Sequence, residues 1–133
     1  MFFVLLPNKY SESRFMTYEQ EMTVTELHTA EKVGSGSLAV FATPALVAFM
    51  ENTATKLLAN LPEDETSVGT SINIQHLKAS AVGEKIYCTA KVTETDGRKY
   101  TFYLEAKDSF GNIVSKGTHE RFVVDIERFM SKI

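Results

Sequence analysis

Apolar and polar residues alternate over a short segment near the start of the chain. Between positions 18 and 24, Tyr18, Met22 and Val24 share one set of alternate positions, and the other set carries Glu19, Glu21 and Thr23. Alternation with a period of two predicts a β-strand. Residues 1–15 show no such period, so we expect a loose N-terminal extension followed by a single domain over residues 16–133.

A long apolar segment with a helix-start signal follows the irregular stretch 25–37. Thr43 is expected to be the N-cap and Pro44 the first helical residue, because a hydroxyl caps free amides and proline suits the first turn. The helix is predicted to run from Pro44 to about Asn60. Its first half, residues 45–50, is apolar on every side, so we expect other elements to enclose it.

Strand-like alternation returns four times in the second half of the chain. The expected strands are residues 68–77, 85–95, 100–106 and 113–124, with a hairpin signal at Asp96-Gly97 and a short closing helix within 125–133. Short connections between consecutive strands imply an antiparallel sheet. The single long helix must then cover one face of that sheet, which predicts the α+β class.

Composition and charge exclude several classes of protein. The 133 residues carry 14 basic and 17 acidic side chains, a net charge of −3, which disfavours binding to nucleic acid. One cysteine and three histidines favour neither a disulfide framework nor a structural metal site, and no cofactor is expected. The apolar opening, residues 1–6, is too short to cross a bilayer and has no basic leader. We therefore expect a cytoplasmic protein that does not bind membranes.

Glu51 is a candidate for chemistry because it follows six consecutive apolar residues of the predicted helix. An enclosed carboxylate must be paired or protonated, since burial of an unpaired charge is costly. The alternative is that Glu51 marks the point where the helix emerges into solvent, because polar residues follow from Asn52 onward.

His76 has the same parity as Ile72 and Ile74 on its predicted strand, so it should point toward the helix. A carboxylate at Glu51 and an imidazole at His76 can together supply general acid–base chemistry. The alternative is a histidine with a purely structural role in the core or a solvated one at the strand end.

Two other positions have both a structural and a functional interpretation. The capping role explains Thr43 fully, although the amides of a helix N-terminus can also bind an oxyanion. Arg121 shares one face of the last strand with His119 and can bind a carbonyl or phosphate, although exposed strand arginines are common. Cys88 lies among apolar residues and is expected to be a small core residue.

Three segments of the chain resemble the fluoroacetyl-CoA thioesterase-like family. They are residues 40–51 (Val-Phe-Ala-Thr-Pro-Ala through Met-Glu), residues 67–76 (Ser-Val-Gly-Thr through Gln-His) and residues 117–121 (Gly-Thr-His-Glu-Arg). The resemblance covers the chain from about Tyr18 onward. It implies a hotdog fold, in which an antiparallel sheet wraps around one long central helix, and a homodimer or a dimer of such dimers.

The resemblance also implies a function and a set of site residues. The chain would hydrolyse an acyl-CoA thioester, of short acyl chain, to the free acid and CoA, with Thr43, Glu51 and His76 as catalytic residues. Gly69 and Arg121 would bind the substrate. Asn52 stands where the specialised fluoroacetyl enzyme has a bulky aromatic residue, so selectivity for fluorine is not implied.

Other functions of a hotdog domain remain open at this stage. The main alternative is a module that binds acyl-CoA or acyl carrier protein without catalysis; a dehydratase or hydratase is a further alternative that no motif favours. A pure binder does not need an enclosed acid beside a base, so the set Thr43, Glu51 and His76 distinguishes catalysis from binding.

Overall fold

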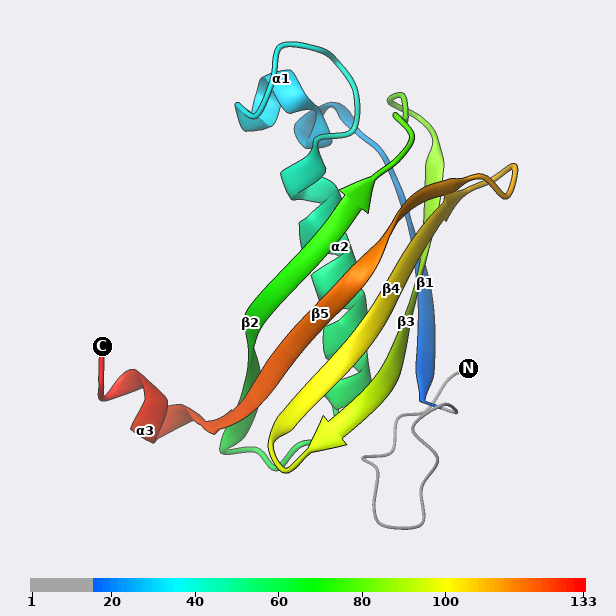
Figure 1. Cartoon of the computed structure of the whole chain (residues 1–133). Coiled ribbons are helices and arrows are strands. Elements are labelled where there is room, and N and C mark those ends of the chain that lie inside the picture. Colours follow the sequence, from blue (N-terminus) through cyan, green and yellow to red (C-terminus); the bar gives the residue numbers. More distant parts are fainter. Residues whose placement is uncertain (1–15) are drawn as a thin grey trace.

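The computed structural model describes residues 16–133, in which five strands form one antiparallel sheet. The strands are β1 (Thr17–Thr23), β2 (Glu65–His76), β3 (Lys85–Asp96), β4 (Lys99–Asp108) and β5 (Ile113–Asp125), in the spatial order β1-β3-β4-β5-β2. The remaining elements are the helices α1 (Ala30–Val33), α2 (Thr43–Thr55) and α3 (Ile126–Met130), and the 3-10 turns η2 (Glu26–His28) and η3 (Lys56–Leu58). Helix α2 lies across one face of the curved sheet, so the α+β prediction is confirmed (Figure 1).

The core lies between α2 and the two central strands. Alternate residues of β3 and β4 are buried, as the period-two pattern predicts, and on α2 the buried apolar residues are Leu46, Met50 and Ala54. Cys88 lies among them and is fully buried. Burial raises the pKa of its thiol to about 11, so Cys88 is a protonated core residue, as expected. Within residues 16–133, no helix is long and apolar enough to cross a membrane.

Helix α2 differs from its prediction at both ends. It begins one residue earlier than expected, with Ala42 as the N-cap and no side-chain capping bond, so the predicted N-cap role of Thr43 is wrong. The hydroxyl of Thr43 is bonded to a side chain on β2 instead. The helix ends at Thr55 and tightens into the 3-10 turn η3, rather than continuing to Asn60. The enclosure that we expected is also incomplete, because Pro44 and Ala48 are exposed in the single chain.

A β-bulge at Thr70 changes which residues of β2 face the helix. Gly69 is opposite Arg121 and Ile72 is opposite His119, although Gly69 and Ile72 are three positions apart on their own strand. Opposite residues of an antiparallel pair lie on the same face of the sheet. The extra residue therefore brings Gly69 onto the same inner face as Ile72.

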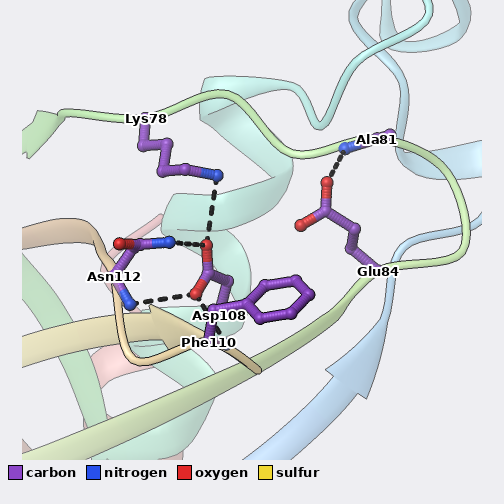
Figure 2. Close-up of polar contacts among 6 residues, drawn as sticks. All are labelled: Lys78, Ala81, Glu84, Asp108, Phe110 and Asn112. Atoms are coloured by element: carbon purple, nitrogen blue, oxygen red, sulfur yellow. Dashed lines mark hydrogen bonds and ion pairs between the residues drawn. The ribbon is translucent and has the colours of Figure 1, made fainter.

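A buried carboxylate holds the end of β2 against the turn between β4 and β5. Asp108, which is 3% exposed, accepts hydrogen bonds from the backbone amides of Phe110 and Asn112 and from the Asn112 side chain (Figure 2). Lys78, two residues beyond His76, forms an ion pair of 3.1 Å with the same carboxylate (Figure 2). This cluster anchors the backbone just beyond His76.

Replacing Asp108 with asparagine should lower the melting temperature most at neutral pH. Burial by itself raises the pKa of Asp108, but hydrogen bonds from Asn112, Lys78 and Phe110 outweigh it and lower the pKa from 3.8 to about 2. The carboxylate therefore stabilises the fold fully above pH 3.8, and this contribution is lost as the pH falls toward 2.

Thermal unfolding of wild type and Asp108→Asn from pH 7 to pH 2 measures this difference. We expect the gap between the two melting temperatures to narrow as the pH falls below 3.8. The control is Asp96→Asn, at the exposed last residue of β3, which should melt like the wild type. A gap that stays constant down to pH 2 would show that the charge of Asp108 does not stabilise the fold.

Candidate active site

Thr43 and His76 meet at the N-terminal end of α2. Thr43 is the first residue of the helix, His76 is the last residue of β2, and Thr43 Oγ1 lies 2.8 Å from His76 Nδ1, within hydrogen-bond distance. The pairing residue of His76 on β5 is the buried Ser115, so the imidazole lies on the helix side of the sheet. The predicted orientation of His76 toward the helix is therefore observed.

The environment of His76 favours its neutral form. Burial lowers the pKa of the imidazole, and a backbone hydrogen bond at Lys78 opposes this shift only in part. The second ring nitrogen, Nε2, is buried and has no hydrogen-bond partner among the described residues. A neutral imidazole that touches a hydroxyl is suited to accept its proton.

Glu51 belongs to a second group, farther along α2. It is half-buried, and its neighbours are Gly69, His119 and Arg121. A Cβ atom at Gly69 would lie 3.3 Å from Arg121 Nη1, 3.3 Å from His119 Cε1 and 3.8 Å from Glu51 Oε2. Gly69 therefore provides the space in which the acid, the guanidinium and the imidazole approach one another.

The guanidinium of Arg121 is fixed by neighbouring strands. Its Nε donates to Ser67 Oγ at 2.8 Å, its Nη2 donates to the Ser67 carbonyl oxygen at 3.1 Å, and its Nη1 lies 3.1 Å from His119 Nε2. Arg121 is only 8% exposed, and the charge of Glu51 favours its cationic form against the cost of burial. The alternative of an exposed strand arginine is therefore wrong, and the role of Arg121 as a site residue stays a prediction.

The structure thus places the five predicted site residues in two groups. Thr43 and His76 form one, and Glu51, Gly69 and Arg121 form the other. Thr43 and Glu51 are eight positions apart on α2, which corresponds to ~12 Å along the helix axis. The contact between Glu51 and His76 that we expected is not among the interactions of residues 16–133.

A cavity of about 350 Å³ adjoins the first group. Thr43 and His76 are part of its lining, together with Phe41, Ala42 and Leu77. The cavity is open to solvent and presents both polar and apolar atoms beside the hydroxyl–imidazole pair. Among residues 16–133, no group of three or more histidine, cysteine or acidic side chains is arranged to hold a metal ion.

His119 lies in the second group, beside Gly69 and Arg121, although sequence reasoning did not select it as a candidate. It is 1% exposed, and its parity with Arg121 was the signal that linked it to the site. Parity alone does not reveal the contact, because burial of both side chains depends on how β2 and α2 cover this part of β5.

Comparisons with known proteins agree on one family. The family model described as "Fluoroacetyl-CoA-specific thioesterase" matches residues 24–127. The fluoroacetyl-CoA thioesterase of Streptantibioticus cattleyicolor is 36% identical over 95 residues, which cover 71% of this chain and 68% of that protein.

Solved structures give the same result for the fold. A variant of the fluoroacetyl-CoA thioesterase in complex with acetyl-CoA has a TM-score of 0.82 at 28% identity, covering 87% of this chain and 92% of the other. A hot-dog-like protein from Thermanaerovibrio acidaminovorans has a TM-score of 0.79 at 23% identity, covering 87% and 86%. The fold is therefore the hotdog fold, as the resemblance implied.

Proposed function

Because the chain belongs to the fluoroacetyl-CoA-specific thioesterase family, we propose that it hydrolyses short acyl-CoA thioesters with Thr43, His76 and Glu51 as its catalytic residues. The family relationship supports thioester hydrolysis as the reaction, and a relative solved with acetyl-CoA supports the substrate class. The observation that carries the assignment of residues is the hydrogen bond of 2.8 Å between Thr43 and His76.

The pair Thr43–His76 suits nucleophilic catalysis. His76 Nδ1 takes the proton of the Thr43 hydroxyl as Oγ1 attacks the thioester carbonyl carbon, and the C–S bond breaks. The imidazolium then gives its proton to the departing CoA thiolate. Water attacks the acyl-threonine with His76 again as the base, which releases the acid and restores the hydroxyl.

A second route omits the acyl-enzyme. In it, His76 and Glu51 activate a water that attacks the thioester directly, and Thr43 only positions that water. The short contact between Thr43 and His76 favours the first route, since it is the geometry of a nucleophile and its base. In both routes, the free amides at the start of α2 are suited to stabilise negative charge on the carbonyl oxygen, and so is the fixed cation of Arg121 where a second copy of the chain brings the two groups together.

The proposal includes a homodimer, because residues 16–133 leave two surfaces uncovered, a backbone edge of the sheet and an apolar part of α2. β2 lies at one edge of the sheet, where its outer row of backbone groups is unpaired within the described chain. Helix α2 packs against the sheet beside β2 (Figure 1). Its residues Pro44 and Ala48 are exposed. A second copy that extends the sheet at β2 would cover both surfaces at once.

Twofold symmetry at this edge would also bring the two groups of site residues together. Thr43 lies against His76, and Glu51, farther along the helix, lies near Gly69. The midpoint of α2 between its two site residues therefore lies beside the midpoint of β2 between its own two. A twofold axis through these midpoints makes α2 and β2 of the second copy run in the opposite direction, so the two groups of site residues follow one another in reverse order. Thr43 and His76 of one protomer then face the partner's Glu51, so each complete site draws residues from both protomers.

Release of free thiol from a panel of acyl-CoAs tests the proposed function. Wild type should hydrolyse short acyl-CoAs, and Thr43→Val and His76→Ala should each lower kcat by roughly 10²–10⁴-fold. Thr118→Val, at an exposed position on the outer face of β5, is the matched control and should keep full activity.

Three outcomes would contradict parts of this proposal. Binding of acyl-CoA by wild type without any thiol release would identify a non-catalytic binding module. Full activity in His76→Ala would agree with thioester hydrolysis but contradict the assignment of His76 as the base. High activity in Thr43→Val, with no acyl-enzyme detected by mass spectrometry, would favour direct attack by water.

A further inference from the structure

His119 is a buried titratable residue to which the proposed catalytic set gives no role. We propose that His119 is a positioning residue, whose neutral imidazole accepts a hydrogen bond from Arg121 and so holds the guanidinium beside Glu51. The inference rests on the proposed function, because Arg121 and Glu51 are assigned to that site. The inference adds a residue that fixes the charged groups Arg121 and Glu51. Within residues 16–133, His119 has no contact with the other catalytic residues, Thr43 and His76.

The hydrogen bonds of His119 define a single tautomer. Nδ1 lies 2.8 Å from the carbonyl oxygen of Ser71, which can only accept, so Nδ1 carries the proton. Nε2 lies 3.1 Å from Nη1 of Arg121, which can only donate, so Nε2 must be without a proton. The ring also packs against Phe102, with centroids 5.9 Å apart. Both nitrogens are used, and the neutral Nδ1–H form satisfies both.

Arg121 needs this acceptor because it is almost fully buried. Ser67 accepts from Nε and Nη2, and His119 accepts from Nη1, so three of the five N–H groups are bonded. Two N–H groups remain to meet Glu51 or a substrate oxygen. Without His119, Nη1 would lose a buried partner, and the planar guanidinium would be free to pivot about its contacts to Ser67.

The charges around His119 make the arrangement sensitive to pH. Burial lowers the pKa of His119 and the charge of Arg121 lowers it further, whereas the Ser71 hydrogen bond and the charges of Glu51 and Glu120 raise it. Protonation of Nε2 would turn this acceptor into a donor that faces the Nη1 donor of Arg121. It would also place two cations, the imidazolium and the guanidinium, side by side. The bond from Arg121 therefore holds at neutral pH and is lost in acid, as the pH falls below the ordinary histidine value of 6.5.

Two isosteric variants separate positioning from packing. In His119→Gln the amide oxygen can reach the place of Nε2 and accept from Arg121, whereas in His119→Asn the shorter amide reaches only the place of Nδ1 and bonds Ser71. We expect His119→Asn to lower kcat by roughly 10–100-fold, the cost of misplacing a catalytic group by about 1 Å, with KM little changed. His119→Gln should recover most of this loss. Equal losses in both variants would overturn the proposal.

The pH profile provides a readout that packing alone would not change. In wild type, both His76 and His119 must be neutral, so log(kcat/KM) should fall in acid with a slope approaching about two, against about one in His119→Gln. Equal slopes would contradict the proposal. Circular dichroism at each pH shows where the protein is folded, and the slopes are compared only over that pH range.

Nitrogen NMR of wild type separates failure of this inference from failure of the proposed function. The imidazole ¹⁵N shifts at neutral pH should identify His119 as the neutral Nδ1–H tautomer, whether or not any acyl-CoA is hydrolysed. The Nε2–H tautomer or a cationic ring would overturn the inference by itself. Because these shifts are measured on wild type, they also test the role of His119 if His119→Asn does not fold.

Discussion

A heterodimer of two inactive variants, Glu51→Gln and His76→Ala, should recover about half of the wild-type thioesterase activity, because one of its two sites is intact. In the proposed dimer, each site combines Thr43 and His76 of one protomer with Glu51 of the other. The heterodimer therefore contains one site with both mutations and one with neither. Each variant alone forms a homodimer in which both sites lack one residue.

We expect this recovery of activity because the two groups of site residues are separated within one chain. Thr43 is bonded to His76, while Glu51 lies ~12 Å farther along α2 with Gly69 and Arg121. We therefore expect one thioester carbonyl to contact Thr43 and His76 of one protomer and Glu51 of the other. Co-expression with two affinity tags isolates the heterodimer, and thiol release from acetyl-CoA measures its activity.

The reciprocal heterodimer is the control. It joins a wild-type chain to a chain that carries both Glu51→Gln and His76→Ala, so each site lacks one residue and the dimer should be inactive. If instead each site belongs to a single protomer, this second heterodimer keeps about half of the activity and the first keeps none. A chain that stays monomeric at assay concentrations with full activity would remove the proposed dimer altogether.

Replacing Gly117 with alanine should be among the most destabilising single substitutions in the chain. Gly117 lies on β5 opposite Ile74 of β2, and a Cβ atom there would collide with the carbonyl oxygen of Asn73 and lie 2.8 Å from Ile74 Cα. These are backbone atoms, so no change of rotamer relieves the clash. We expect a loss near the upper end of the roughly 1–3 kcal/mol typical of overpacking.

Urea unfolding followed by circular dichroism measures the free energy of unfolding for Gly117→Ala. The neighbouring variant Thr118→Ala is the control, because its side chain points outward, and it should cost less than ~1 kcal/mol. The substitution should also lower activity, since Asn73 lies on β2 between Gly69 and His76 and a shift of this strand moves both site groups. Unfolding at the wild-type urea concentration would show that β2 and β5 tolerate the extra atom.

Local patterns in the sequence were sufficient to predict the five strands, the start of the long helix and the buried faces of β3 and β4. The period-two alternation on β3 and β4 identified the buried residues, because successive strand side chains point to opposite faces regardless of the rest of the fold. The motif Thr43-Pro44 located the start of the long helix to within one residue. The same patterns had already indicated Glu51 and His76 as candidate site residues, and the family resemblance added the roles of the site residues and the position Gly69.

Only the tertiary structure decided how those polar residues are grouped. Thr43 could serve as a cap by local rules, but His76, 33 positions away, is bonded to its hydroxyl instead. The bulge at Thr70 resets the parity of β2, so simple alternation from Ile72 would have placed Gly69 on the wrong face. Periodicity along a chain reports the direction of each side chain from its own backbone. Which groups meet depends on pairing between distant segments, and the sequence pattern carries no direct record of that pairing.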